Sequence, residues 1–363
     1  MEKVIERNAE IELKIERSVA AILVASKKDL VIDEIIFPKL LQSGQVLVEL
    51  VSAGICGAQI NEIDATKGVD KFLPHLLGHE GFCKVLDVAR DVTRVRIGDK
   101  AIMHWRKSSG IDASPPEYSW NGKKLNAGWV TTFNKHAVVS ENRLSKIADD
   151  CKLSSSVLPL LGCALTTAYG IVKKEIDLAY GKTVVIFGLG GIGLAILLML
   201  KMQNPNIMVI GIDRENLKLE IAKKMGAAET IMFSSKNQCN LKLRELLGES
   251  KADIALETTG DKSCIELAYE LTKENGLVNL IGVPNSNEKT SLYTLPLHYG
   301  KILKGSNGGS SVPDEDIPIL IQKIESGKLS FDDYPLSSYK LSQINEAIHE
   351  LRNGRPGRSI IQF

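Results

Sequence analysis

The sequence predicts an α/β protein in two parts, a β-rich part that opens the chain and a doubly wound parallel sheet that follows it. Three observations support this prediction. Short strand-like segments separated by turn residues fill the first half of the chain. A buried strand, a glycine-rich loop and an apolar helix follow one another within residues 182–218. Strand-like and helix-like segments then alternate as far as residue 281, which is typical of a parallel sheet with helices on both faces.

The opening part has short β-branched segments bounded by Gly, Pro, Ser and Lys, as strands and their turns require. Residues 1–17 alternate loosely between charged and apolar types, and we expect a solvated arm there rather than an extra edge strand. Residues 106–128 are polar and rich in Pro, Gly, Ser and Trp, which predicts a long loop. The expected strands are 21–24, 30–32, 45–51, 84–88, 100–103 and 135–139.

The glycine-rich loop follows an apolar strand at 183–187 and opens a helix. Its residues fit the pattern GxGxxG, in which glycine permits a tight turn, close approach of a pyrophosphate and close packing of helix on strand. The helix N-terminus offers free amides and a positive dipole to phosphate. The segment therefore predicts a dinucleotide site. Its loop residues are Gly188, Leu189, Gly190, Gly191, Ile192 and Gly193.

An acid follows the next strand, 207–212, at the place where a dinucleotide's adenosine ribose would lie. Asp213 can accept hydrogen bonds from both ribose hydroxyls and would repel a 2′-phosphate, so we expect NAD rather than NADP. Arg214 beside it weakens the preference, because an arginine there can bind a phosphate. Further strands are expected at 230–233, 254–257, 277–281 and 359–363, and helices at 158–172, 216–225, 241–247, 263–271, 314–325 and 341–352.

The composition restricts which classes of partner and which cellular compartment we expect for this protein. Forty-five basic and forty-four acidic residues leave a net charge of +1, which argues against nucleic acid or an anionic membrane surface as partner. The longest apolar run, Ile192 to Leu200, is too short to cross a bilayer, and Met1 to Arg17 lacks the apolar segment of a signal peptide. The six cysteines form no CxxC pair, as expected of reduced thiols. We expect a soluble, cytoplasmic protein.

Three residues upstream of the nucleotide site have side chains that bind zinc. Cys56 lies in Gly-Ile-Cys-Gly, His79 in Gly-His-Glu-Gly and Cys163 in Leu-Gly-Cys-Ala. Thiolate and imidazole are the usual zinc ligands in proteins. Taken singly, each residue also fits a plainer interpretation, as a small buried hydrophobe or a hydrogen-bonded core histidine.

Together these motifs resemble those of the medium-chain zinc-dependent alcohol dehydrogenase family, and the resemblance covers nearly all of the chain. It implies a GroES-like β-rich catalytic domain made of residues 1–180 and completed by 313–363, with a Rossmann NAD-binding domain at 181–312. It also implies a homodimer or homotetramer and a small alcohol or carbonyl as substrate. The further matching segments are Gly98-Asp99-Lys100, Thr167-Ala168-Tyr169-Gly170, Lys304-Gly305-Ser306, Ile344-Asn345-Glu346-Ala347 and Arg358-Ser359-Ile360-Ile361.

The resemblance also implies roles for individual residues. Cys56, His79 and Cys163 would bind one catalytic zinc, and Glu80 beside them would approach it while ligands exchange. Bound zinc would act as a Lewis acid on an alcohol whose carbon passes hydride to NAD. For Lys218 and Arg358 the alternative is a solvated surface charge. The residues implied to bind the cofactor are Thr167, Gly188, Gly190, Gly191, Ile192, Gly193, Asp213, Lys218 and Arg358.

The sequence departs from the family in two places. The four cysteines of the family's structural zinc site are missing, since residues 99–150 contain none, so we predict one zinc per chain. Ala58 replaces a hydroxyl that relays the substrate's proton, Gln59 replaces an acid that supports a zinc ligand, and Asn61 stands where some members have a relay histidine. Water or another side chain such as His104 would then carry the proton, which is the interpretation we favour. Otherwise the substrate would supply its own group, or the enzyme would not run the ordinary alcohol reaction.

The expected function is hydride transfer between NAD and a primary or secondary alcohol, for example a polyol, a cyclitol or a sugar derivative. Two alternatives stay open. The protein could retain NAD for transient oxidation within an isomerase-type cycle, or it could be a non-catalytic NAD-binding protein on the same scaffold. The presence of all three ligands and Glu80 argues against the last alternative.

Overall fold

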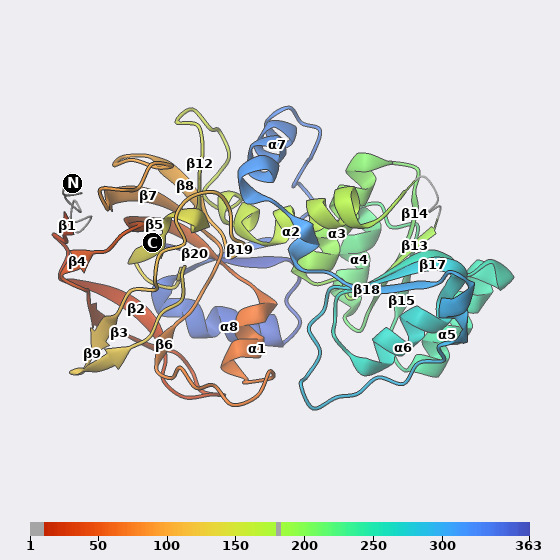
Figure 1. The fold of residues 1–363 in the computed structure, drawn as a ribbon. Helices are drawn as coiled ribbons and strands as arrows, with labels where there is room; N and C mark the ends of the chain where they lie inside the picture. Colours follow the sequence, from red (N-terminus) through yellow and green to blue (C-terminus); the bar gives the residue numbers. More distant parts are fainter. Residues whose placement is uncertain (1–10, 179–182) are drawn as a thin grey trace, which may run out of the picture.

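A computed structural model describes residues 11–178 and 183–363, and the elements given below are those of these residues. The molecule is elongated, with a β-rich part at one end and an α/β part at the other (Figure 1). The C-terminus lies in the β-rich part, so both ends of the chain build it. Among the described residues, no helix combines the length and the apolar character that a membrane span requires.

The main sheet of the β-rich part is built around one long strand, β5 (Gln45–Ile55), which is buried along most of its length. β5 pairs antiparallel with β7, β11 and β20, and β20 brings the C-terminal segment alongside Ile55. The remaining members of this seven-stranded sheet lie outside β7 and β20. Their bounds are β7 (Gly81–Val88), β8 (Lys100–Met103), β11 (His136–Ser140), β12 (Leu144–Lys146), β19 (Leu336–Lys340) and β20 (Arg358–Gln362).

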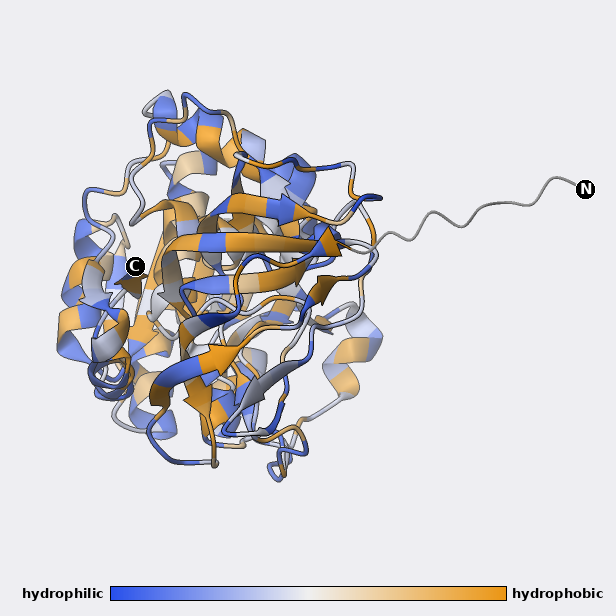
Figure 2. Cartoon of the chain, turned by 90° about the vertical axis from the view of Figure 1, so that its left-hand side faces the viewer, coloured by the Kyte–Doolittle hydropathy of each residue, from blue (hydrophilic) through white to orange (hydrophobic). Residues whose placement is uncertain are grey.

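A second, five-stranded sheet covers the first, in the order β10-β9-β3-β2-β6. Figure 2 faces this end of the molecule and shows strands banded in hydrophobic and hydrophilic colours, as expected where successive side chains point to opposite faces. A short pair, β1 with β4, lies apart from it. The bounds are β1 (Ile11–Glu12), β2 (Arg17–Leu23), β3 (Val31–Ile36), β4 (Leu40–Leu41), β6 (His75–Leu76), β9 (Tyr118–Trp120) and β10 (Lys123–Leu125).

Two expectations for the β-rich part are wrong. The segment 106–128 is not a continuous loop, because β9 and β10 form a hairpin inside it. The hairpin turns at Asn121 and Gly122, which both have positive φ, as a two-residue type I′ turn requires. Residues 11–12 form an edge strand rather than a solvated arm, and residues 1–10 lie outside the described part of the chain.

The α/β part is a six-stranded parallel sheet in the order β15-β14-β13-β16-β17-β18. The chain leaves the central strand β13 in one direction for β14 and β15, then returns to its other side for β16, β17 and β18. Such a switch point leaves a crevice beyond the carboxyl ends of the strands, where ligands bind. The strands are β13 (Thr183–Phe187), β14 (Met208–Asp213), β15 (Glu229–Met232), β16 (Ala252–Glu257), β17 (Thr272–Leu280) and β18 (Ile302–Gly305).

Helices cover this sheet and join the two parts. α2 and α3 lie side by side at the junction, where one buried cluster includes Leu165 of α2, Leu197 of α3 and Leu320 of α7 (Figure 1). The predicted domain boundaries remain predictions, and the one after residue 180 falls outside the described residues. The helices are α1 (Gly57–Ile63), α2 (Ala164–Gly170), α3 (Gly191–Gln203), α4 (Asn216–Lys224), α5 (Lys236–Leu247), α6 (Lys262–Leu271), α7 (Pro313–Glu325) and α8 (Ile344–Arg352).

The single helix expected at 158–172 is also wrong. A 3₁₀ turn over Leu158–Gly162 ends at Cys163, whose φ of −150° and ψ of −72° are not helical, and α2 begins after it. A Cβ on Gly162 would lie 2.2 Å from the carbonyl oxygen of Met103, so only glycine allows the turn to approach β8 this closely. The break gives Cys163 a position at the start of α2, facing the β-rich part.

Candidate functional site

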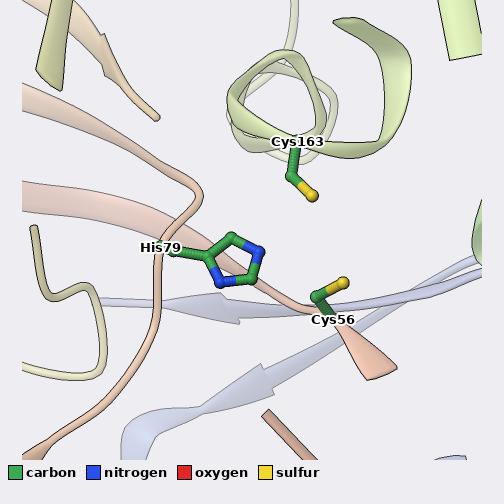
Figure 3. Close-up of side chains that lie close together, drawn as sticks. All are labelled: Cys56, His79 and Cys163. Atoms are coloured by element: carbon green, nitrogen blue, oxygen red, sulfur yellow. The ribbon is translucent and has the colours of Figure 1, made fainter. Parts of the chain in front are cut away.

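Three side chains from separate segments converge where the two parts of the molecule meet. Cys56 follows β5 and caps α1, His79 lies between β6 and β7, and Cys163 precedes α2. One ligand atom from each residue lies within 4.8 Å of the others. Figure 3 shows both sulfur atoms and the imidazole ring facing the same space. Within residues 11–178 and 183–363, no second group of three His, Cys, Asp or Glu side chains is arranged in this way.

The group fits a zinc ion. His79 Nε2 is buried and has no hydrogen-bond partner among the residues that the structure describes, which is costly unless a ligand satisfies it. Two thiolates and one imidazole are a known donor set for catalytic zinc, and they leave a fourth position for water or substrate. The residues present can therefore hold the metal that the family resemblance implies.

The pKa values of the two thiols shift in opposite directions. A hydrogen bond from the Cys163 thiol lowers the pKa of Cys56 well below the usual thiol value, and the same bond raises the pKa of Cys163. Burial alone would lower the pKa of His79, but the neighbouring Cys56 raises it overall. One thiolate is thus already stabilised before a cation binds, because the Cys163 thiol donates to it.

Gln59, in the first turn of α1, contacts two of the three ligand residues. Its Oε1 accepts a hydrogen bond from the Cys56 backbone N–H at 3.0 Å, and its Nε2 lies 2.5 Å from His79 Nδ1. The side chain is 1% exposed. The sequence marks Gln59 only as the replacement of an acid, and the structure adds that it orients His79.

Glu80 and Arg358 form a buried pair between the cysteine–histidine group and the glycine loop. Arg358 Nε lies 3.5 Å from Glu80 Oε1, and its Nη1 donates to the carbonyl oxygen of Ile55. Burial raises the pKa of Glu80, and the Arg358 charge opposes that shift. Arg358 is buried, so a solvated surface charge is the wrong interpretation for it. Glu80 is not among the clustered ligand atoms, and its approach to a metal remains a prediction.

The glycine loop adopts the backbone that its sequence requires. Gly188 has a φ of +90°, which favours glycine, and a Cβ on Gly193 would lie 1.9 Å from the Gly188 carbonyl oxygen. A Cβ on Gly190 would meet no atom within 4 Å, so this side of the loop is open for a phosphate. A Cβ on Gly191 would lie 3.2 Å from the Arg358 guanidinium carbon, which places that cation beside the start of α3. Ile192 follows in the first turn.

Asp213 is held at the end of β14 by the glycine loop itself. Its Oδ2 accepts a hydrogen bond from the Leu189 backbone N–H at 2.7 Å, and its Oδ1 accepts one from Glu215 at 3.0 Å. Lys218 Nζ lies 3.7 Å from the same carboxylate and is mostly buried, so it is not simply a solvated charge. Arg214, by contrast, is three-quarters exposed and pairs with Glu215.

Two further predicted residues have different outcomes. Thr167 lies one turn after Cys163 on α2, where its backbone N–H donates to the Cys163 carbonyl, so both residues lie on the same face of the helix. His104 is fully buried, and its ring nitrogens contact the Arg106 carbonyl at 2.7 Å and Ser145 Oγ at 3.1 Å. Burial lowers the pKa of His104 to about 4. These contacts assign His104 a structural role and do not support it as a proton carrier.

Tyr334, which no sequence motif indicates, also supports the site. Its hydroxyl donates to the Gly191 carbonyl oxygen at 2.9 Å, and burial raises its pKa to about 12, so it stays a neutral donor. Tyr334 belongs to no motif and reaches the loop only because the C-terminal segment folds back.

Family models and related proteins match most of the chain. The family model described as alcohol dehydrogenase GroES-like domain matches residues 42–149, and the one described as zinc-binding dehydrogenase matches residues 191–326. Alcohol dehydrogenase 6 of Peromyscus maniculatus is 27% identical over 343 residues, covering 87% of this chain and 90% of that protein. An S-(hydroxymethyl)glutathione dehydrogenase of Escherichia coli O1:K1 / APEC is 27% identical over 379 residues, covering 96% and 100%.

Solved structures share the fold. Benzyl alcohol dehydrogenase from Acinetobacter calcoaceticus superposes with a TM-score of 0.84 at 23% identity, covering 96% of this chain and 100% of that one. A protein described as a short chain alcohol dehydrogenase from E. coli CFT073, solved with NADH, gives a TM-score of 0.76 at 20% identity, covering 96% and 100%. The family models, the relatives and the fold together show that this chain is an oxidoreductase of the medium-chain zinc-dependent alcohol dehydrogenase family.

Proposed function

We propose that the protein transfers hydride between a primary or secondary alcohol and NAD, with one zinc ion held by Cys56, His79 and Cys163. The observation that carries this proposal is the convergence of the three ligand atoms within 4.8 Å, with no hydrogen-bond partner for His79 Nε2 in the described part of the chain. Arg358 connects this group to the nucleotide loop, because it lies 3.5 Å from Glu80 and against Gly191. Metal and dinucleotide would therefore bind next to each other.

Each part of the site has a distinct task in this reaction. Bound zinc would polarise the alcohol oxygen as a Lewis acid, and NAD would accept the hydride. The amides at the start of α3 and the Arg358 guanidinium would bind the pyrophosphate, since both present positive charge to it. Thr167 would contact the nicotinamide. Glu80 would balance the Arg358 charge, and its approach to the metal during ligand exchange belongs to the same proposal.

The carboxylate of Asp213 supports NAD as the cofactor. Two backbone amides fix its position at the end of β14, beside the loop where the adenosine would lie. A fixed anion accepts hydrogen bonds from ribose hydroxyls and repels a 2′-phosphate. Lys218 beside it would contact the same ribose. The E. coli neighbour solved with NADH is consistent with this choice.

The proton of the alcohol would leave through water. Ala58 has no hydroxyl and is exposed at the start of α1, while both nitrogens of His104 are engaged elsewhere. Solvent can therefore reach the place where the family has a relay group. The substrate we propose is a small alcohol such as a polyol, a cyclitol or a sugar derivative, whose neighbouring hydroxyls could also pass on the proton.

We also propose a homodimer or homotetramer that forms through the edge of the α/β sheet. β18 is one of the two edge strands of the six-stranded sheet, and large apolar side chains on and before it are exposed. Exposed apolar surface along an unpaired strand favours association. These side chains include Tyr293, Leu295, Tyr299 and Ile302.

The test is a screen of alcohols, polyols and their carbonyl forms that follows NADH absorbance, with the metal content measured in parallel. We expect one zinc per chain, an active alcohol or carbonyl substrate, and no turnover after Cys163→Ala. Two zinc ions per chain would contradict the single site. Absence of any cofactor signal with a zinc-loaded protein would favour the non-catalytic alternative.

A further inference from the structure

The Gln59 carboxamide faces two groups that both need an acceptor when His79 binds a metal. In the structure its single oxygen accepts the Cys56 N–H, so only its NH₂ group remains for His79 Nδ1. An NH₂ group can only donate. His79 Nδ1 must therefore present its lone pair, and the proton of the neutral imidazole is left on Nε2.

That tautomer does not suit a metal ligand. His79 Nε2 is the ring nitrogen that faces the thiols, and within residues 11–178 and 183–363 it has no hydrogen-bond partner. It can bind a cation only through a free lone pair. The proton must then move to Nδ1, which needs an acceptor in place of the Gln59 NH₂ group. If the carboxamide turns over to provide its oxygen, the NH₂ group meets the Cys56 N–H at the start of α1 instead. In either orientation two donors face each other.

We propose that Gln59 is a positioning residue that holds His79 in the tautomer that does not bind zinc, so that this chain binds zinc more weakly than an otherwise identical chain with a carboxylate at position 59. This inference rests on the proposed zinc site. A glutamate has the same length as glutamine and two acceptor oxygens, so it would accept both the Cys56 N–H and the His79 Nδ1–H. Glutamate is also a favoured residue at this capping position of a helix, so Gln59→Glu should keep α1 intact.

The expected effect is a rise in zinc affinity of about 10- to 100-fold for Gln59→Glu, the range in which partners of metal-bound histidines act. The measurement is a Zn²⁺ titration of the full-length, metal-stripped protein against a competing chelator. Asn61→Asp is the matched control, because it adds the same charge to α1 two residues further on. A rise in Gln59→Glu that exceeds the rise in Asn61→Asp at least tenfold supports the proposal.

The tautomer itself is the second readout, since a general effect of charge or packing would not change it. ¹⁵N spectra of histidine-labelled, metal-free protein distinguish a protonated ring nitrogen from one with a lone pair, and a His79→Asn variant identifies the His79 signals. We expect Nε2–H in the natural chain and Nδ1–H in Gln59→Glu. Nδ1–H in the metal-free natural chain would overturn the proposal.

The outcomes separate this inference from the function on which it rests. Equal zinc affinity in the natural chain and Gln59→Glu overturns the role of Gln59 and leaves the zinc site standing. Absence of zinc binding at Cys56, His79 and Cys163 in all three proteins overturns both.

Discussion

The site has a nucleotide side, formed by the glycine loop and Asp213, and a metal side around Cys56, His79 and Cys163. The two sides differ in how many of their buried polar atoms have hydrogen-bond partners within the protein. On the nucleotide side, Asp213 accepts two backbone hydrogen bonds and lies beside Lys218. On the metal side, His79 Nε2 and both carboxylate oxygens of Glu80 are buried with no hydrogen-bond partner among the described residues. The nucleotide crevice is thus organised by hydrogen bonds within the chain, whereas the proposed metal side leaves His79 Nε2 available for a ligand.

The largest effect is expected from removing a ligand on the metal side. Cys163→Ala should lose the zinc and reduce kcat/KM on the order of 10³-fold or more, since Lewis-acid polarisation supplies several kcal/mol and about 1.4 kcal/mol is tenfold in rate. Metal analysis and steady-state kinetics check this. Cys151→Ala, at a half-buried cysteine outside the cluster, is the control and should keep both zinc and activity. A Cys163→Ala variant with full zinc content would contradict the assignment.

The buried pair between the two sides should give the next largest effect. Arg358→Met leaves the Glu80 carboxylate buried beside no cation, which should lower the free energy of unfolding by about 3–5 kcal/mol. Urea denaturation measures it. The double variant with Glu80→Gln removes the second charge and should recover much of the loss. If the single and the double variant are equally unstable, the ion pair with Glu80 is not the way in which Arg358 stabilises the protein.

Removing the Asp213 charge on the nucleotide side should change the preference for NAD over NADP. We expect this effect to be smaller than the two effects above. Asp213→Asn removes the negative charge, and a hydrogen bond to a charged group contributes about 1.5–3 kcal/mol, so KM for NAD should rise roughly 10- to 100-fold. KM for NADP should rise much less or fall. Kinetics with both cofactors test this, and Arg214→Ala at the exposed neighbour serves as control. An equal change for both cofactors would show that Asp213 only supports the loop.

The smallest effect is expected at the altered proton path. Ala58 is exposed, so water can already carry the proton, and Ala58→Ser should leave turnover of the true substrate unimproved. A positioned proton carrier contributes typically 10²–10⁴-fold where it is needed, so even part of that gain would be visible. A large increase in kcat would mean that the natural chain has no working relay.

The parts that the sequence predicts well are those defined by local pattern. The strand at 183–187, the glycine loop and Asp213 follow one another within about thirty residues, and the structure has β13 and the loop where the pattern places them. Apolar composition and glycine spacing are sufficient there, because each residue acts on its near neighbours in the chain.

The parts that the sequence misses depend on contacts between distant segments. The break at Cys163 arises because Gly162 packs on Met103, sixty residues away in the chain, and the sequence pattern alone reads as one helix. Tyr334 reaches the glycine loop only through the returning C-terminal segment. The β9–β10 hairpin is a different case. The Asn121-Gly122 pair is a sequence pattern typical of hairpin turns, but the polar residues around it favoured the prediction of a loop.

The central claim is that Cys56, His79 and Cys163 together bind one zinc ion. X-ray absorption at the zinc edge of the purified protein, combined with metal analysis, tests it most directly. We expect one zinc per chain with two sulfur neighbours at about 2.3 Å and nitrogen or oxygen neighbours at about 2.0–2.1 Å. A shell of four sulfurs, a shell without sulfur, or two zinc ions per chain would contradict it.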